Sequence, residues 1–458
     1  MSNWWIVGTV SIGAFMAALD ASIINVALPT LNHAFPYGIH RTAWISIAYL
    51  LTLTSLLAAF GSLADQYGRK RMYTSGFIVF SLGSVLCGLS YHLDLLIGAR
   101  VIQAVGAAML QANSVAIITQ SVPAQDRGKA IGIQGSSQAI GLSLGPVLGG
   151  LLVTYFPWQM IFFMNIPIGI LGTVLAYKIL PTSPRQPKQP FDYIGALLLA
   201  PTLIFLTLGL TESAATDILS PHILKDFIIA AVTGLLFYLQ ESRHKNPILP
   251  LSLFKNRVFV VGNLTGLLSY AMMFGVLFLM PFYLEHALKH APTEAGLLLT
   301  PVPIAMSLMA PLAGALADRF AIRTLTTWGL LALTAGSFIL ANLPNRWLIT
   351  LTLVLIGIGM GLFTPPNNSS VMGAVSKDKL GLTGGILNMA RSMGMSLGIA
   401  FSGTLYGSVL RTFKQVGPTP LPVVNKAFHH GFIGLGLLGI LALLILRLGK
   451  KENSEKPA

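Results

Sequence analysis

Stretches of about 20 mostly apolar residues recur along almost the whole chain, and this feature limits the possible folds more than any other. Apolar residues fill 54% of the 458 positions and charged residues only 10%, whereas a soluble protein places roughly a quarter of its residues in charge. A water-soluble core could not bury so much apolar surface, so the sequence predicts an integral membrane protein. The stretches lack the two-residue alternation of barrel strands, which favours helices.

The apolar stretches predict an all-α membrane protein with about fourteen spans. No loop between them is long enough for a soluble domain, and the largest polar stretch is a Pro-rich basic linker at 180–190. The expected spans are 4–28, 43–63, 73–91, 95–119, 130–154, 160–180, 192–211, 223–240, 258–284, 295–317, 323–342, 347–370, 382–409 and 429–448.

Basic residues indicate the orientation of these spans. If the N-terminus is cytoplasmic, alternating spans place about 20 of the 29 Lys and Arg residues in cytoplasmic segments, as the positive-inside rule requires. The net charge of +14 therefore has an explanation other than nucleic-acid binding. We expect both termini in the cytoplasm and the chain in a cell membrane. The first stretch contains Asp20 and lacks a cleavage site, so it is interpreted as a retained span and not a signal peptide.

An internal repeat divides the chain. The pentapeptide GSLAD at 61–65 returns as GALAD at 314–318, and GIQGSSQAIGLSLG at 132–145 returns as GILNMARSMGMSLG at the same shift of 253 residues. Two matches at one shift predict two parallel six-helix halves, 1–180 and 258–448, joined by an insert with two further helices at 181–257 and followed by a tail at 449–458. This plan resembles that of the major facilitator transporters, which place their substrate site between the halves.

The turn after the second span carries a specific signature. Residues 61–71 read GSLADQYGRKR and closely resemble the cytoplasmic loop motif of the major facilitator superfamily. Its glycines permit a tight reversal and close helix approach. The resemblance implies a latch that holds the outward-facing state, and it assigns a gating role to the following residues: Gly61, Asp65, Gly68, Arg69 and, through the repeat, Asp318.

A glycine-rich segment in the fifth span resembles the motif of the exporters in this superfamily. Residues 141–150 read GLSLGPVLGG, and the repeat keeps the spacing of the small residues but replaces the proline with Ile399. Small residues let helices approach closely, and a proline removes one backbone hydrogen bond and bends the helix. The asymmetry indicates a directional role for the first half. The gating residues assigned here are Gly141, Gly145, Pro146, Gly149 and Gly150.

One acidic residue lies near the middle of the first span. Asp20 belongs to the segment LDASIINVALP at 19–29, which looks like the first-helix motif of the fourteen-span drug:proton antiporters. A carboxylate at membrane depth must be paired, protonated or in contact with a water-filled cavity, and these are the properties of a proton-coupling site. Arg100, in a segment that resembles an Arg-containing motif of the superfamily apart from Ala104, is its expected partner. A permanently paired structural Asp20 remains the alternative.

Polar residues in other spans are candidates for the substrate cavity. Arg391 and Asn388 correspond through the repeat to Gln138 and Gly135, and roles in substrate binding or in joining helices are both open. Pro365 and Pro366 are expected to break their span. Glu285, Glu294 and the loop residue His33 are interpreted as interfacial or solvated. The full set of cavity candidates is Asn25, Gln103, Asn113, Gln138, Asn388 and Arg391.

The motifs together identify the chain as a member of the fourteen-span drug:proton antiporter branch of the major facilitator superfamily. That resemblance implies a proton-coupled exporter of small hydrophobic or amphiphilic compounds, working by alternating access. Its partners would be the substrate, protons and the bilayer, with no cofactor, metal or nucleic acid, and it would act as a monomer, alone or with a periplasmic adaptor. A proton symporter or a lipid or siderophore transporter on the same scaffold is the alternative. The sequence carries no nucleotide-binding loop or catalytic cluster, so no enzyme is expected.

Overall fold

The computed structural model describes most of the chain, and the residues described are helical or lie in short connections between helices. Residues 183–190 of the expected linker at 180–190, the tail beyond 449 and the gating candidate Asp318 lie outside the described part. The described residues are 3–123, 126–182, 192–212, 220–244, 247, 251–317, 320–342, 345–375, 380–412 and 421–449.

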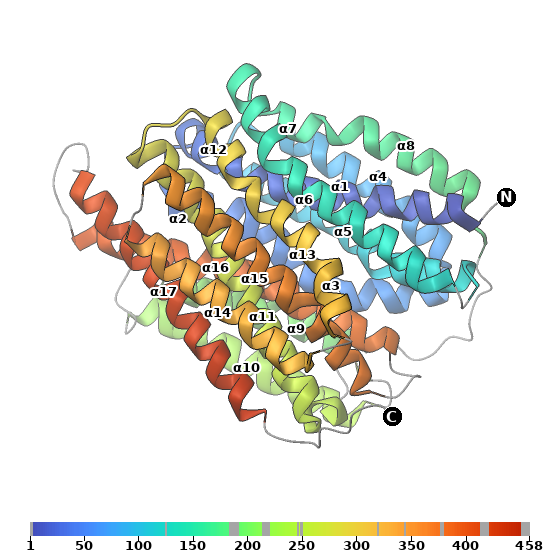
Figure 1. The fold of residues 1–458 in the computed structure, drawn as a ribbon. Helices are drawn as coiled ribbons and strands as arrows, with labels where there is room; N and C mark the ends of the chain where they lie inside the picture. Colours follow the sequence, from blue (N-terminus) through green and yellow to red (C-terminus); the bar gives the residue numbers. More distant parts are fainter. Residues whose placement is uncertain are drawn as a thin grey trace.

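The helices run roughly alongside one another as a bundle (Figure 1). Their bounds are α1 (Asn3–Ala34), α2 (Ile39–Thr42), α3 (Trp44–Tyr67), α4 (Arg69–Gly88), α5 (Leu93–Ser121), α6 (Arg127–Tyr155), α7 (Met160–Phe163), α8 (Asn165–Ile179), α9 (Tyr193–Glu212), α10 (Pro221–Arg243), η2 (Leu251–Lys255), α11 (Arg257–Phe282), η3 (Tyr283–Ala287), α12 (Pro292–Leu299), α13 (Pro301–Ala317), α14 (Ile322–Ala341), α15 (Arg346–Gly373), α16 (Leu380–Thr412) and α17 (Leu421–Leu448).

Many of these helices are suited to a lipid environment. Within the described residues, 11 helical stretches are long and apolar enough to cross a membrane, and shorter apolar stretches occur at Trp44–Leu57 and Tyr193–Gly209. Large apolar side chains such as Leu197, Leu308 and Trp347 are exposed on the outside of the bundle. Lipid tails satisfy such side chains, and the helices satisfy their own backbone hydrogen bonds, so the chain is an all-helical, multi-pass membrane protein.

The helices pack in two groups that correspond to the sequence repeat. In the first bundle, α1, α3, α4, α5, α6 and α8 pack together, and in the second bundle α11 to α17 do so. The helix pair α1 and α6 is matched by α11 and α16. In both pairs the repeated glycines make the close approach: Gly141 lies against the backbone of α1 at Phe15, and Gly394 lies against that of α11 at Leu267.

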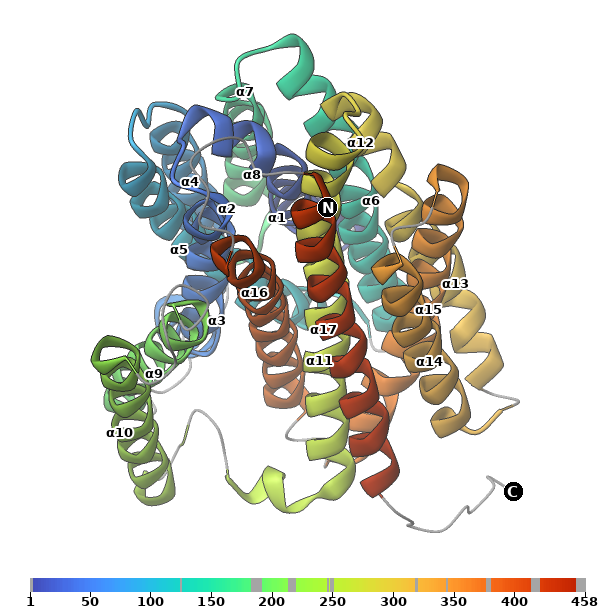
Figure 2. The same ribbon diagram turned by 90° about the vertical axis from the view of Figure 1, so that its left-hand side faces the viewer.

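Helices α9 and α10 form a separate pair at the side of the molecule (Figure 2). A hydrogen bond of 3.1 Å between the hydroxyls of Thr202 and Thr233 joins them, and the Gln240 amide donates to Asp192 at 2.8 Å. Helix α9 packs against both α3 of the first bundle and α16 of the second. This inserted pair therefore contacts both bundles.

The two ends of the molecule are named here after residues that lie at them. The Gly68 end contains the turn between α3 and α4, where Gly68 adopts a φ of 97° that favours glycine. The Trp158 end contains the connection between α6 and α7, where Trp158 packs on Phe35 just after α1. The described contacts between the bundles that involve hydrogen bonds or rings lie at the Trp158 end, where Thr154 and Thr293 are hydrogen-bonded at 2.6 Å.

One expectation about helix continuity is wrong. Pro365 and Pro366 were expected to break their span, but α15 passes through both of them. A proline removes one backbone donor, and the loss can be tolerated where neighbouring helices pack around the site. Pro366 and Asn367 are buried in such packing, and the Asn367 amide donates to the carbonyl oxygen of Gly262 on α11 at 3.0 Å.

Candidate functional site

The structure brings Asp20 and Arg100 together inside the first bundle. Arg100 Nη1, on α5, donates to Asp20 Oδ2, on α1, at 2.6 Å, and each side chain is 1% exposed. The two residues are 80 positions apart, so the contact depends on how α1 and α5 pack. Removing one partner from a buried ion pair leaves the other charge uncompensated, which costs about 3–5 kcal/mol. The pair therefore joins α1 and α5, and it places an ionisable group in the interior of the first bundle.

Two amide side chains and one hydroxyl complete the shell around this ion pair. The Gln103 amide donates to Asp20 Oδ1 at 2.9 Å, and so does the Asn165 amide from the start of α8, also at 2.9 Å. Both amides also donate to the Ser84 hydroxyl on α4, at 3.2 and 3.1 Å. Asp20 thus accepts three hydrogen bonds from α5 and α8. A carboxylate accepts hydrogen bonds from three donors best when it is ionised.

Aromatic rings and a backbone carbonyl surround the arginine. The Arg100 guanidinium carbon lies 4.1 Å from the ring centroid of Tyr49 on α3 and 6.0 Å from that of Phe162. Its Nε donates to the Ile45 carbonyl oxygen at 3.2 Å. A ring face attracts a cation, and the attraction is stronger away from water. The guanidinium is thus held by charge, ring faces and a carbonyl at once.

The burial of this cluster determines when Asp20 can exchange a proton with water. Ser84, Gln103 and Asn165 are fully buried, so the carboxylate is closed off from water in this arrangement of helices. Proton exchange at Asp20 therefore requires movement of α1, α5 or α8 relative to the others. A coupling site must link proton binding to helix movement, and a buried acid that exchanges its proton only when helices move meets this requirement.

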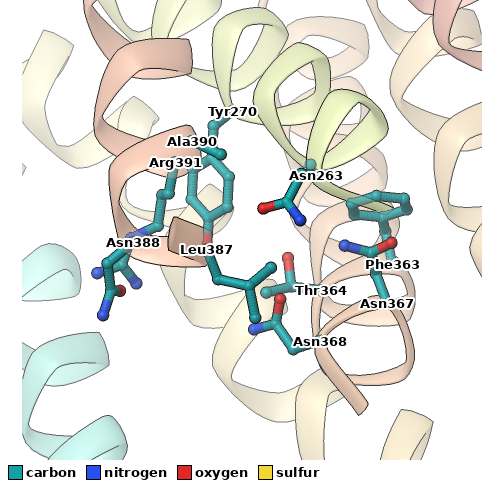
Figure 3. Close-up of a pocket in the computed structure, with 11 residues that line it drawn as sticks. Asn263, Tyr270, Phe363, Thr364, Asn367, Asn368, Leu387, Asn388, Ala390 and Arg391 are labelled. Carbon is teal, nitrogen blue, oxygen red and sulfur yellow. The ribbon is translucent and has the colours of Figure 1, made fainter. Parts of the chain in front are cut away.

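The second bundle contains a polar pocket. Helices α11, α15 and α16 form a small pocket with about 30 Å³ of free space, lined by Asn263, Tyr270, Phe363, Thr364, Asn367, Asn368, Leu387, Asn388 and Arg391, with Gly266 and Ala390 (Figure 3). The Arg391 guanidinium lies 5.8 Å from the Tyr270 ring centroid. Of the cavity candidates, Asn388 and Arg391 thus lie together at one pocket.

The remaining cavity candidates lie elsewhere. Gln103 belongs to the shell around Asp20, and Asn113 is fully buried on α5, where its amide donates to the Met109 carbonyl oxygen at 2.8 Å. Asn25 is 3% exposed on α1, and Gln138 is half-buried on α6. Their role at a substrate site stays a prediction.

The glycine-rich segment of α6 contacts both bundles. A Cβ atom on Gly141 would lie 2.6 Å from the Phe15 carbonyl oxygen, and one on Gly149 would lie 3.1 Å from that of Ile23, both on α1. Farther along, a Cβ on Gly150 would lie 2.6 Å from the Pro292 carbonyl oxygen, at the start of α12 in the second bundle. Figure 1 shows α12 next to α6. The predicted gating motif is therefore a packing surface within the first bundle and between the two.

The other predicted gating residues lie at the Gly68 end. Gly61 is half-buried near the end of α3, with open space around its Cα, and Arg69 is the first residue of α4. Asp65 lies in the last turn of α3, and its side chain is outside the described part. The latch role assigned to this turn stays a prediction.

Two histidines meet between the bundles at the Trp158 end. The His33 ring, at the end of α1, stacks on the His286 ring of η3 with centroids 5.5 Å apart. Glu285 precedes His286 in this π-helical turn, and its Oε1 is buried without a hydrogen-bond partner. Glu294 hydrogen-bonds His290 at 2.5 Å in an exposed position. His33 thus contributes to the contact between the bundles, beyond the solvated role expected for it.

Sequence reasoning missed several residues of the two clusters. Ser84, Tyr49 and Asn165 were not among the predicted site residues. Asn263 and Thr364 also went unnoticed. A polar residue within an apolar span was the available signal, but the chain has many such residues, and only the packing shows which of them meet.

The comparison with protein families decides the classification. The family described as Major Facilitator Superfamily matches residues 10–282 and 262–458, which together cover nearly the whole chain. The chain belongs to the major facilitator superfamily. Proteins of this superfamily are transporters, so the chain is a membrane transporter and not an enzyme.

Curated members of the major facilitator superfamily resemble the chain over most of its length. The riboflavin transporter RibZ of Clostridioides difficile is 37% identical over 463 residues, with 99% of each chain covered. The multidrug resistance protein Stp of Mycobacterium tuberculosis is 32% identical, covering 87% of this chain and 75% of its own length. The methylenomycin A resistance protein of Streptomyces coelicolor is 32% identical, covering 86% and 84%. The resemblance to the drug-resistance branch is confirmed by such relatives.

Solved structures of the superfamily share the fold. A bacterial homologue of the human lysosomal transporter Spinster matches with a TM-score of 0.70 and 16% identity, covering 98% of this chain and 96% of that one. The xylose transporter XylE of Escherichia coli matches with a TM-score of 0.66 and 15% identity, covering 100% and 99%. The two-bundle arrangement is thus the major facilitator fold.

Proposed function

We propose that the chain is a proton-coupled secondary transporter that exports small hydrophobic or amphiphilic compounds by alternating access. In this proposal the chain crosses the membrane fourteen times, with halves at 1–180 and 258–448 and a two-helix insert at 181–257. The Gly68 end, which carries the basic segment RKR at 69–71, faces the cytoplasm together with both termini. The relatives named as resistance proteins support export of drug-like compounds.

The buried pair of Asp20 and Arg100 is the observation that carries the coupling proposal. An ionised pair with three hydrogen bonds to the carboxylate is stable when it is sealed from water. Protonation of Asp20 removes the charge that holds Arg100, so the proton and the helix packing are linked. Each pH unit across the membrane supplies about 1.4 kcal/mol per proton, and each 100 mV supplies about 2.3 kcal/mol per charge moved.

The present arrangement fits the inward-facing state in this cycle. Among the described residues, the hydrogen-bonded and ring contacts between the bundles lie at the Trp158 end: the hydrogen bond of Thr154 with Thr293 and the stack of His33 on His286. The Spinster homologue, whose fold this chain shares, is described as inward-facing.

A second candidate is proton-coupled uptake of a vitamin-like compound. The observation in its favour is the similarity to the riboflavin transporter RibZ, which extends over 99% of both chains. The glycine-rich segment of α6 with Pro146, which resembles the exporter motif and packs on α1, favours export instead. The two candidates differ in the direction of transport and not in the coupling site.

Direction and coupling can be tested together. Accumulation of labelled substrate in inverted vesicles would indicate export, and accumulation in whole cells would indicate uptake, each with and without a protonophore. Purified protein should release protons when substrate is added, and Asp20→Asn should abolish this release while keeping substrate binding. Equal proton release from the wild type and from Asp20→Asn would reject Asp20 as the coupling site and turn attention to Glu285 and Glu294.

A further inference from the structure

Two polar groups in the pocket of the second bundle have no partner. The Asn263 amide nitrogen donates to the carbonyl oxygen of Phe259 at 2.8 Å. Because a carbonyl oxygen only accepts, this bond fixes the orientation of the amide and leaves Oδ1 as the free atom. Asn263 Oδ1 is buried with no hydrogen-bond partner, and so is the Thr364 hydroxyl. In Figure 3 both oxygens point into the space between α11 and α15.

Leaving such groups unpaired is unfavourable. A buried polar atom without a partner costs about 1–3 kcal/mol, and the Asn263 side chain is buried with 8% exposure. A ligand that supplies the missing partners would recover this free energy on binding. Oδ1 of Asn263 accepts only, so it needs an N–H or O–H group, whereas the Thr364 hydroxyl can donate to a carbonyl oxygen.

The charge of the pocket limits the kinds of ligand that it can bind. Arg391 is the one charged residue among those that line it, and no ion pair of Arg391 with a carboxylate is found in the described residues. An uncompensated guanidinium repels cations and favours carbonyl-rich or anionic groups. The Tyr270 ring borders the pocket and supplies a flat apolar edge, which suits an aromatic ligand.

We propose that this pocket binds the edge of a flat heteroaromatic compound in which an N–H group lies next to a carbonyl group, as in a lactam or cyclic imide. Asn263 Oδ1 accepts from the N–H group, the Thr364 hydroxyl donates to the carbonyl oxygen, and Arg391 disfavours cationic compounds. The pocket has about 30 Å³ of free space, so only the edge of the ring that carries the N–H and carbonyl groups enters it. This assignment deepens the proposed function and rests on it.

Binding of riboflavin and of its N3-methyl derivative to the purified protein tests the site, because the two probes differ only in the N–H group. Fluorescence titration of the wild type should give a dissociation constant at least about tenfold lower for riboflavin than for the methylated compound. Asn263→Ala should weaken riboflavin binding and remove the difference between the two probes. The cationic dye ethidium should not compete with riboflavin in the wild type but should compete in Arg391→Ala.

A matched pair of threonine variants separates the pocket from general effects on folding. Thr364→Val removes the unpartnered hydroxyl and should weaken riboflavin binding. Thr352→Val removes a buried hydroxyl on the same helix that donates to the Leu348 carbonyl oxygen at 2.6 Å, away from the pocket, and should leave binding unchanged. Equal binding of both probes to the wild type, no riboflavin binding, or discrimination that survives in Asn263→Ala would overturn the proposal.

Transport assays distinguish failure of this site from failure of the proposed function. If proteoliposomes show proton-driven transport but the wild type does not discriminate between the two probes, the binding site is wrong and the transporter assignment stands. If discrimination depends on Asn263 but transport does not respond to a proton gradient, the binding site stands and proton coupling is wrong.

Discussion

Gly296 on α12 lies directly against the carbonyl group of Pro146 on α6, so that even a methyl group on Gly296 would overlap the Pro146 carbonyl oxygen. The two residues belong to different bundles, and their contact lies at the Trp158 end. Gly150 makes the reciprocal approach to α12. The segment that resembles the exporter motif therefore packs closely against the opposite bundle because a glycine on one side leaves room for the backbone of the other.

Gly296→Ala should shift the protein away from the arrangement described here. The added methyl group would cost about 1–3 kcal/mol in this arrangement because backbone atoms cannot move aside easily. Distances between spin labels across the Trp158 end should become longer and more broadly distributed. Gly98→Ala, at an exposed α5 site with no atom within 4 Å of the added Cβ, is the control and should leave the distances unchanged. Unchanged distances in Gly296→Ala would show that this contact does not control the opening.

Cross-linking the Trp158 end should stop transport. The Thr154 and Thr293 hydroxyls are 2.6 Å apart, so cysteines at these positions are close enough for an oxidant or a short reagent to join them. Transport in a variant that carries Thr154→Cys, Thr293→Cys and Cys87→Ser should fall to background after cross-linking. It should return after cleavage with reductant. Continued transport by the fully cross-linked protein would mean that the Trp158 end does not open during the cycle.

Asn165→Ala should move the pH dependence of transport. The variant removes one of three hydrogen bonds to Asp20, and a hydrogen bond to a charged group is worth about 1.5–3 kcal/mol, so the pH profile of transport should differ from that of the wild type. Asn342→Ala, whose amide only donates to a carbonyl at an exposed helix end, should not change it. A pH profile identical to that of the wild type would argue for a purely structural Asp20.

Cys87 should be unreactive in the folded protein. Its side chain is fully buried, and its sulfur lies 3.6 Å from Gln103 Oε1 in the same cluster. A maleimide reagent should label it only after denaturation, and labelling should become faster in Asp20→Asn, where Arg100 loses its partner and the cluster loosens. Rapid labelling of the native wild type would mean that water reaches this region without any helix movement.

The sequence allowed the membrane class, the repeat and the pairing partner of Asp20 to be predicted, because each leaves a signal along the chain. Span length follows from bilayer thickness, and an acid and an arginine in apolar spans are each costly alone. The contacts of Ser84 and Asn165 were not predictable, since they depend on how α4 and α8 are rotated about their axes. The same holds for Asn263 and Thr364. A few polar residues per span leave that rotation undetermined.

The expected break of the helix at Pro365 and Pro366 was wrong because packing against a neighbouring helix compensates for the lost backbone hydrogen bonds. Two adjacent prolines normally end a helix, because each removes a donor and crowds the preceding turn. In α15 the helix continues past Pro365 and Pro366, and the next residue, Asn367, hydrogen-bonds to the backbone of α11. Local rules describe the isolated helix, and this segment is stabilised by its neighbour.

The position of α9 has a consequence for compounds dissolved in the lipid. The bundles meet along two sides, one where α3 packs on α16 and the other where α6 packs on α12 and α13. On the first side α9 contacts both helices of the seam, and α10 lies alongside it (Figure 2). The α9–α10 pair therefore covers one of the two seams, so an apolar compound in the lipid meets this pair on that side and the α6 and α13 helices themselves on the other.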